Sequence, residues 1–202
     1  MVPRVTEEHR MDLKRRIIQG AIDHFSKNGY DSTKVDDIAD ALGISKGTIY
    51  FYFGDKSGLF RAISDHFVDS VKEELGAIFR TAEEKDMDVA QFYENLRRLE
   101  HGTDRLMVEM VAESTRNPKL RKVLLEHRRR VLEVTIEHIK KLVAQGMLRK
   151  DTNVVALAAG EMALYIGLTI SKLLGVSEEE NKAAWIEIAS LLRYALTDTK
   201  SG

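Results

Sequence analysis

Apolar residues recur every three or four positions along nearly the whole chain, the spacing that gathers side chains on one face of an α-helix. The clearest example lies in residues 12–28, where Leu13, Ile17, Ala21 and Phe25 stand four positions apart. Proline, which breaks helices, occurs only twice in 202 residues. The pattern therefore predicts an all-α protein.

Continued along the chain, the same spacing predicts about nine helices. Thr33 and Ser45 stand where the second and third helices need an N-cap, and Asp36 takes the capping-box position of the second. Asp55 stands in the same way before the fourth helix. The expected helices have the approximate bounds 12–28, 34–42, 45–53, 56–85, 88–100, 104–115, 118–145, 153–174 and 178–196.

The most apolar helix, at 153–174, is too interrupted to cross a membrane. Glu161 and Lys172 fall within it, and its longest uncharged run, 162–171, is shorter than the roughly 20 residues that a membrane span needs. Residues 1–10 contain no apolar segment of the kind found in signal peptides. Together with the absence of cysteine, these features predict a cytoplasmic protein without a membrane partner.

Motifs of enzymatic chemistry are missing from the sequence. The chain has no Gly-rich phosphate loop, no nucleophile elbow and no pair of histidines spaced for a metal. The acidic pair Asp36-Asp37 and the acidic run 178–180 are explained by the preference of helix N-termini for negative charge. We expect no catalysis, no cofactor and no metal site.

A different chemistry is concentrated between residues 34 and 56. Two short helices joined by A-L-G-I-S match a helix-turn-helix, whose second helix enters the major groove of DNA, although an ordinary helical hairpin is the alternative. Gly47 lies inside that second helix, where glycine costs about 1 kcal/mol relative to alanine, which suggests that something approaches the backbone there. Lys56 stands beside free N–H groups of the next helix, and makes either an anion site or a solvated surface lysine.

Helical spacing divides the aromatic run of the third helix into two faces. Ile49 and Phe53 are four apart and form the inward pair. Tyr50 and Tyr52 are then directed outward or sideways, where tyrosine hydroxyls can donate to phosphates. Phe51 can belong to either face, so its side remains open.

The run from Ile17 to Leu59 contains A-I-D-H-F-S-K-N-G-Y-D-S-T-K-V-D-D-I-A, A-L-G-I-S-K-G-T-I-Y-F-Y-F and D-K-S-G-L-F, and it closely resembles the DNA-binding domain of TetR-family transcriptional regulators. The resemblance implies a three-helix DNA-binding domain at 1–55 and a larger helical effector-binding and dimerisation domain at 56–202. Gly54 and Gly58 depart from the family's commoner residues, so we expect a looser turn before the fourth helix. Together with the undecided Phe51, the expected contacts to double-stranded operator DNA are Thr33, Lys34, Ser45, Lys46, Gly47, Thr48, Tyr50, Tyr52 and Lys56.

The net charge gives no sign of DNA binding, because the chain has 31 Lys and Arg residues and 32 Asp and Glu residues. Residues 1–60 are also balanced, with nine basic and nine acidic residues. A DNA-binding surface must therefore be local, with its basic side chains segregated from the acidic ones. The basic set is Lys14, Arg15, Arg16, Lys34, Lys46 and Lys56, and the acidic set expected elsewhere is Asp23, Asp36, Asp37 and Asp40.

A stripe of small residues runs along the helix at 153–174 and would let another helix approach closely. In TetR-like proteins the last two helices of each subunit form a four-helix dimer interface, so the resemblance implies a homodimer on a roughly palindromic operator. The alternative is that the stripe packs only against its own subunit. The expected interface residues are Gly160, Ala163, Gly167, Ser171, Trp185, Ile188 and Leu192.

The resemblance also implies an effector pocket among the central helices. Methionine and aromatic side chains there would form an adaptable apolar lining, so we expect a small hydrophobic effector, with a fatty acyl-CoA as one candidate. The expected function is a ligand-responsive repressor, and the alternative is a structural or effector-independent DNA-binding protein of the same fold. The candidate pocket residues are Phe92, Tyr93, Leu96, Met107, Met110, Val111, Met162, Tyr165 and Leu168.

Overall fold

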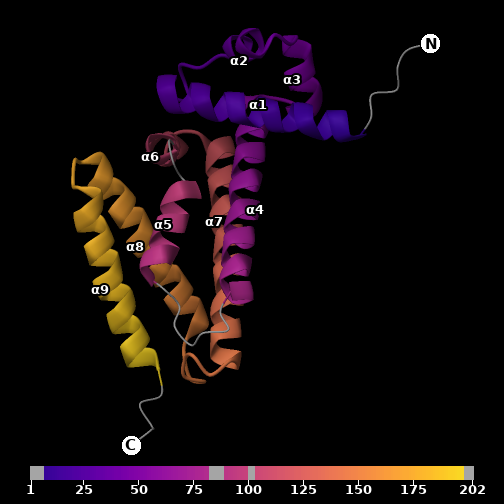
Figure 1. Ribbon diagram of the computed structural model, residues 1–202. Helices are drawn as coiled ribbons and strands as arrows, with labels where there is room; N and C mark the ends of the chain where they lie inside the picture. Colours follow the sequence, from indigo (N-terminus) through magenta and orange to yellow (C-terminus); the bar gives the residue numbers. More distant parts are fainter. Residues whose placement is uncertain (1–6, 82–88, 100–102, 198–202) are drawn as a thin grey trace, which may run out of the picture. The chain divides into compact units, whose positions relative to one another are not determined.

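The computed structural model describes residues 7–81, 89–99 and 103–197, and these residues fold into nine α-helices without a strand. The all-α prediction is confirmed, and the expected helix bounds hold to within five residues. The helices, labelled in Figure 1, are α1 (Glu7–Asn28), α2 (Val35–Leu42), α3 (Lys46–Phe53), α4 (Lys56–Thr81), α5 (Val89–Leu99), α6 (Asp104–Ser114), α7 (Pro118–Ala144), α8 (Val154–Leu173) and α9 (Glu178–Leu196).

The chain divides into two compact units. Unit 1 consists of Met1–Phe67 and Arg105–Leu125, and unit 2 consists of Val68–Asp104 and Glu126–Gly202. The division falls inside α4 and α7, so each of these two helices contributes residues to both units. No single cut in the sequence separates the units.

The core of unit 1 is one apolar cluster built from all of its helices. α1 packs on α2, and α2 packs on α3. Each large apolar side chain removed from water in this cluster contributes about 2 kcal/mol to its stability. The members with the least exposure are Ile17, Phe25, Ile38, Ile49, Leu59, Leu106, Met110 and Leu120.

The turn between α1 and α2 starts α2 one residue later than expected. Thr33 does not cap this helix, because its hydroxyl donates to the carbonyl oxygen of Gly29 at 2.8 Å. Lys34 takes the N-cap position, and its backbone N–H donates to Oδ2 of Asp37 at 3.0 Å. The predictions of Thr33 as N-cap and Asp36 as its capping-box partner are therefore wrong: the Thr33 hydroxyl satisfies a buried carbonyl of the preceding turn instead.

The turn between α3 and α4 is tight. Gly54 has a φ of 78°, which glycine adopts at no steric cost. Oδ1 of Asp55 accepts from the N–H of Gly58 at 2.7 Å, which confirms Asp55 as the cap of α4. A Cβ atom on Gly58 would lie 1.8 Å from the carbonyl oxygen of Phe53. The expectation of a looser turn is wrong, because the two glycines let α4 begin directly against the end of α3.

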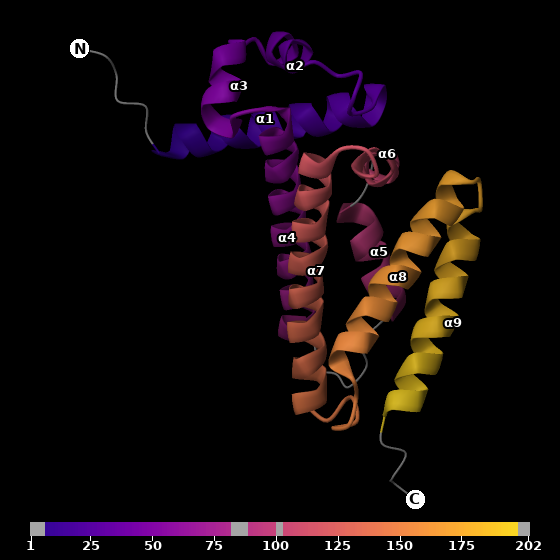
Figure 2. The same ribbon diagram turned by 180° about the vertical axis from the view of Figure 1, so that it is seen from behind.

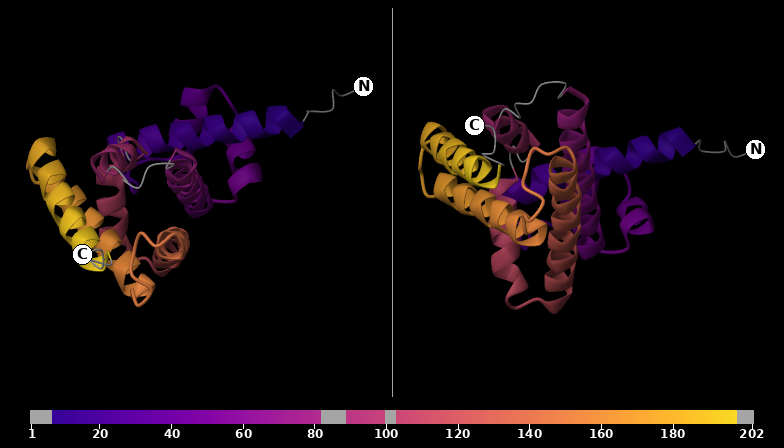
Figure 3. Two further views of the ribbon diagram at one scale, coloured as in Figure 1. Left: turned by 60° about the horizontal axis from the view of Figure 1, so that its bottom comes forward. Right: turned by 90° about the horizontal axis from the view of Figure 1, so that it is seen from below.

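Unit 2 has two smaller apolar clusters in place of one. The first joins α7 to the start of α8 and includes Ile139, Leu142 and Ala158. The second lies between α5, α8 and α9 and includes Tyr93 and Trp185. α9 packs against both α5 and α8, and Figures 2 and 3 show α8 and α9 side by side.

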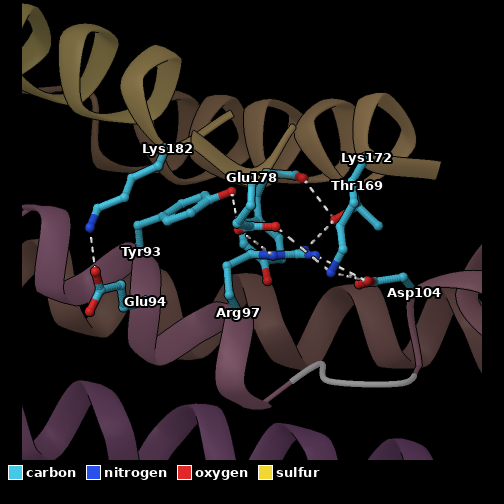
Figure 4. A network of polar contacts seen from close by, with 9 residues as sticks. Tyr93, Glu94, Arg97, Asp104, Thr169, Lys172, Glu178 and Lys182 are labelled. Carbon is cyan, nitrogen blue, oxygen red and sulfur yellow. Dashed lines mark hydrogen bonds and ion pairs between the residues drawn. The ribbon is translucent and has the colours of Figure 1, made fainter. Parts of the chain in front are cut away.

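A network of ion pairs and hydrogen bonds joins α5, the start of α6, α8 and α9 (Figure 4). The guanidinium group of Arg97 lies 3.0 Å from the carboxylate of Asp104 and 3.4 Å from that of Glu178. Nζ of Lys172 lies 2.9 Å from the same Asp104 carboxylate. Burial and a hydrogen bond to Glu178 raise the pKa of Tyr93, so its hydroxyl keeps its proton and donates to Glu178 at 2.8 Å. The network therefore fastens the start of α9 to α5 and α8.

α8 is the one helix, among the residues that the structure describes, whose length and mean hydropathy would suit a membrane span. Only 17% of its most apolar window is buried within the structure. Glu161 and Lys172 interrupt it, and Lys172 takes part in the network with Asp104. Much of the apolar surface of α8 is thus left uncovered within unit 2.

Candidate functional site

α3 is capped at its N-terminus and anchored to the core of unit 1 along one face. Oγ of Ser45 accepts from the backbone N–H of Thr48 at 3.1 Å, which confirms Ser45 as the N-cap. Ile49 is buried in the core of unit 1, and Phe53 packs against the same cluster. The predicted inward pair is confirmed, and the remaining side chains of α3 point away from the core or along its edge.

The aromatic residues of α3 differ in their exposure. Phe51 is 82% exposed and Tyr50 is 40% exposed, which assigns the undecided Phe51 to the outer surface. Tyr52 is only partly exposed and packs at the edge of the core, with Nζ of Lys14 5.6 Å from its ring centre. Such apolar surface on an exposed helix, beside lysines, suits contact with base edges and sugars rather than with water alone.

The first turn of α3 presents Lys46 and Gly47 to solvent. A Cβ atom on Gly47 would meet only Oγ of Ser45, at an ordinary 3.6 Å, so packing within the chain does not require glycine there. Nζ of Lys46 lies 2.5 Å from the carboxylate of Asp36 and 5.7 Å from the ring centre of Tyr50. The predicted segregation of charge is wrong at this point, because Asp36 accompanies a lysine expected to face DNA.

The other predicted DNA contacts differ in how far their side chains are exposed to solvent. The side chain of Lys34 is exposed, whereas that of Thr33 is 2% exposed, so a phosphate contact from Thr33 would require its side chain to turn outward. Lys56 is half-buried: its ammonium group donates to the carbonyl oxygen of Asp31 at 3.1 Å and lies 4.3 Å from the ring centre of Tyr30. Burial lowers the pKa of Lys56. The ammonium group of Lys56 is therefore held in place by contacts within the chain.

A pocket in unit 2 lies between α5, the end of α7, α8 and α9. Its empty volume is about 690 Å³, open solvent included. Every described lining residue except Glu161 is apolar. The lining consists of Val89, Phe92, Leu142, Met147, Leu148, Leu157, Glu161, Leu164, Trp185, Ala189, Leu192 and Leu196.

The predicted pocket residues do not gather in one place. Phe92 lines the pocket and also packs against the second apolar cluster of unit 2, to which Tyr93, Leu96, Tyr165 and Leu168 belong without lining the pocket. Met162 on α8 is partly buried and lies outside the lining. The α6 members fall in unit 1, where Met110 is core, Val111 is exposed and Met107 is partly buried. Periodicity could mark these residues as inward-facing, but it could not assign them to different clusters.

Phe92 is the one described lining residue that the sequence predicted for the pocket, and Glu161 is the ionisable residue among those it missed. Burial among apolar side chains raises the pKa of its carboxyl group to about 7. It forms no hydrogen bond or ion pair with any residue that the structure describes. The available signal was a carboxylate in the middle of an otherwise apolar helix, which the sequence analysis used only to exclude a membrane span.

The small residues of α8 face open space within the subunit. A Cβ atom on Gly160 or on Gly167 would have no neighbour within 4 Å among the described residues, and Ala163 is also exposed. Leu191 on α9 is 58% exposed. Further exposed apolar residues on these two helices are Val155, Ile166, Ile170, Leu173, Ile188, Leu192 and Tyr194.

Two predicted interface residues are less accessible than that surface. Ser171 is partly buried, and Trp185 is only 4% exposed. The indole N–H of Trp185 donates to the carbonyl oxygen of Val89 at 3.0 Å, and its ring packs against those of Phe92 and Tyr93. Trp185 therefore supports the subunit from within and offers almost no surface to a partner.

The described residues contain no group of three or more His, Asp or Glu side chains that could hold a metal ion. The polar residues that do meet, in the network around Arg97, pair acids with bases and donors with acceptors. The geometry leaves two uncovered surfaces and a pocket: the outer side of α3, the face of α8 and α9, and the apolar space around Glu161.

Comparisons with known proteins cover both parts of the chain. Residues 17–63 match the bacterial regulatory proteins of the tetR family, and residues 91–193 match the C-terminal part of BetI-type transcriptional repressors. The chain is 28% identical over 170 residues to the HTH-type transcriptional regulator UidR of Escherichia coli K12, which covers 83% of each protein.

Solved structures agree with the fold. A TetR-family transcriptional regulator from Syntrophomonas wolfei has a TM-score of 0.79 at 16% identity, covering 95% of this chain and 100% of that one. A transcriptional regulator from Saccharomonospora viridis, determined in complex with choline, has a TM-score of 0.67 at 24% identity, covering 89% of this chain and 96% of that one. At these identities the likeness concerns the fold alone.

Proposed function

Because the chain belongs to the TetR family of DNA-binding transcriptional regulators, we propose that it is a repressor that binds a roughly palindromic operator as a homodimer. We further propose that a small hydrophobic effector releases it from DNA and that it acts in the cytoplasm. The observation that carries the proposal is the two-sided character of α3. Ile49 fixes the helix to the core, while Lys46, Gly47, Tyr50 and Phe51 remain accessible on its outer side.

Each accessible residue of α3 supports a specific kind of DNA contact. Gly47 has no neighbour that would require it, so its lack of a side chain favours close approach of an external group such as a base edge or a phosphate. Lys46 can exchange its ion pair with Asp36 for a phosphate, because both side chains are half exposed and the pair is weak in water. Lys56, already positioned over Tyr30, is suited to hold a phosphate beside the start of α4.

The uncovered face of α8 and α9 supports dimerisation. Glycine costs a helix about 1 kcal/mol relative to alanine, and no neighbour within the subunit explains Gly160 or Gly167. A second helix that approaches these positions closely would explain both glycines and would cover the exposed apolar side chains around them. The same face from a second copy is the natural occupant, because two-fold dimers present one surface twice.

The apolar pocket of unit 2 supports the effector. Its lining suits a hydrophobic ligand, and the described lining residues include no basic side chain for the phosphates of an acyl-CoA. We therefore favour a small apolar effector over an acyl-CoA. Release follows if the effector binds better to a conformation in which α4 tilts and carries the two α3 helices of a dimer out of register with the operator.

Dimerisation and operator binding can be tested with one matched pair of variants. Leu191→Arg puts a charge into the proposed interface, whereas Leu125→Arg puts the same charge at an equally exposed leucine of α7. We expect Leu191→Arg to be monomeric in sedimentation experiments and to lose at least a hundredfold in affinity for the gene's upstream region in a gel shift. Leu125→Arg should remain dimeric and bind normally. A Leu191→Arg protein that stays dimeric would contradict the proposed interface.

Effector response needs a separate test, because an effector-independent DNA-binding protein of the same fold is the rival function. Purified protein would be analysed by mass spectrometry for a bound compound, and compounds that raise its melting temperature would be added to the gel shift. We expect one class of apolar compounds to raise the melting temperature and to dissociate the DNA complex. Stabilising compounds that leave DNA binding unchanged would favour the rival function.

A further inference from the structure

The pocket of unit 2 combines an apolar wall with one carboxyl group. Leucine, methionine, valine and alanine side chains make most of the wall, and Glu161 from α8 is its sole ionisable member among the described residues. A carboxylate in such surroundings loses much of its hydration and needs a compensating charge or donor. The subunit supplies neither from the residues that the structure describes.

The internal cations of unit 2 are committed elsewhere. Arg97 is paired with Asp104 and Glu178, and Lys172 is paired with the same two acids (Figure 4). The polar network is thus internally matched in charge, whereas the described lining of the pocket contains an acid without a base. A ligand that carries a positive charge would supply the partner that Glu161 lacks among the described residues.

Two aromatic rings line the same pocket. Phe92 on α5 and Trp185 on α9 have ring centres 5.9 Å apart at an interplanar angle of 43°. The faces of aromatic rings attract cations, tryptophan most strongly, and they do so best where water is excluded. Trp185 is only 4% exposed and the ring of Phe92 stacks on His138, so the rings act mainly as apolar wall. The carboxyl group of Glu161 makes this space complementary to a cation that carries hydrocarbon.

We infer that this pocket binds an apolar organic cation, an alkylamine or alkylammonium ion, whose charged head pairs with Glu161 and whose hydrocarbon part lies along Leu157, Leu164 and Leu192. The inference rests on the proposed effector-responsive function and names the chemical class of the effector. An anion of similar size, such as a fatty acid, would bring a second negative charge to Glu161 and bind less well.

Proton linkage provides a signature of the pairing. A cation binds the ionised form of Glu161, so binding of a permanently charged ammonium ion must release protons wherever the free protein holds this carboxyl group protonated. With a pKa of about 7 in the free protein, release should be substantial at pH 6.5 and should vanish above pH 8.5. Of the nearby groups on the packed helices, His138 stacks on Phe92 and burial lowers its pKa to about 4, with Lys141 adding to this, so it stays neutral over that range.

The test is calorimetric titration of the full-length protein with three probes of equal chain length: hexyltrimethylammonium, hexanoate and hexanol. We expect hexyltrimethylammonium to bind at least tenfold more tightly than either other probe at pH 8. Glu161→Gln should weaken its binding at least tenfold and abolish proton release, measured as the difference in binding heat between two buffers at pH 6.5. Glu187→Gln is the matched control, because it removes the charge of an exposed glutamate on α9. It should change neither the affinity for the cation nor the proton release.

Several outcomes would overturn the inference. They are equal affinity for the three probes, tighter binding of hexanoate, no binding of the cation, or unchanged cation binding by Glu161→Gln. The glutamine variant should fold at least as well as the parent, because it removes a poorly hydrated carboxylate, and its melting temperature verifies this. Because this binding is measured without DNA, the site and the effector response are tested separately. A cation that binds through Glu161 but does not dissociate the operator complex in a gel shift would support the site and refute the effector response.

Discussion

The two units use their polar side chains in different ways. In unit 1, Thr33 and Lys56 donate to backbone carbonyl oxygens of the segment between α1 and α2, so each polar side chain fixes the course of a turn. In unit 2, Arg97 forms ion pairs with Asp104 and Glu178, so charged side chains hold whole helices together. The difference suits the tasks proposed for them, because a helix that contacts DNA needs accurate placement by short turns, whereas a unit that binds an effector needs space between its helices.

The two units also differ in where their apolar side chains lie. Unit 1 closes around a single core and exposes on α3 only the side chains proposed to meet DNA. Unit 2 divides its apolar residues between two clusters, a pocket and an uncovered face on α8 and α9. Unit 1 is therefore closed around its own core, whereas unit 2 leaves apolar surface for the proposed dimer partner and effector.

The largest effect is expected from a methyl group at the turn between α3 and α4. Gly58→Ala would place Cβ 1.8 Å from the carbonyl oxygen of Phe53, so the backbone must shift, and we expect a loss of at least about 3 kcal/mol in the free energy of unfolding. Gly47→Ala is the control: it has room, and should stabilise α3 by up to about 1 kcal/mol while weakening DNA binding. Urea denaturation and gel shifts measure both. Equal stability of the two variants would refute the tight turn.

Unit 2 should be most sensitive where its ion network is buried. Arg97→Ala leaves the nearly buried carboxylate of Asp104 with Lys172 alone, and we expect a loss of about 3 kcal/mol in unfolding free energy. Arg98→Ala changes the adjacent exposed residue and should cost less than about 0.5 kcal/mol. Thermal denaturation followed by circular dichroism distinguishes them. A loss of similar size in both variants would mean that the network contributes little.

The smallest effect is expected at Lys56, whose ammonium group holds the turn between α1 and α2 and is proposed to contact a DNA phosphate. Lys56→Ala should cost about 1 kcal/mol of stability through the lost contacts with Asp31 and Tyr30. It should weaken binding to all DNA sequences alike and lower the slope of log affinity against log salt by about one. Fluorescence anisotropy at several salt concentrations measures this slope. A loss confined to the specific operator would indicate a base contact instead.

Most of the fold could be predicted, because helical spacing and capping residues are local signals. Ser45 and Asp55 cap α3 and α4 as expected, and Ile49 with Phe53 faces the core. The exposure of Phe51 could not be predicted, since helical spacing placed it at the border between two faces. Whether the core continues over such a position is decided by other helices, which lie far away in sequence.

The errors also have a common physical origin. Thr33 has the right chemistry for an N-cap, but a nearby buried carbonyl of Gly29 competes for its hydroxyl. Gly58 suggested looseness in the sequence, although in the fold its missing side chain permits contact with Phe53. Glu161 was noticed as a charge in an apolar helix, but only the pocket around it indicates a binding role. Each outcome depends on contacts between segments that composition and spacing leave unspecified.

The contact between Gly58 and the carbonyl oxygen of Phe53 has a mechanical consequence. With no spare distance between them, the end of α3 and the first turn of α4 form a stiff joint that resists sliding and twisting. A rotation applied to the first turn of α4 must therefore reorient α3 through nearly the same angle. In the proposed release mechanism, unit 1 would need no softening or unfolding, only a change of direction in the 26-residue helix α4, which is closely joined to the helix proposed to enter the groove.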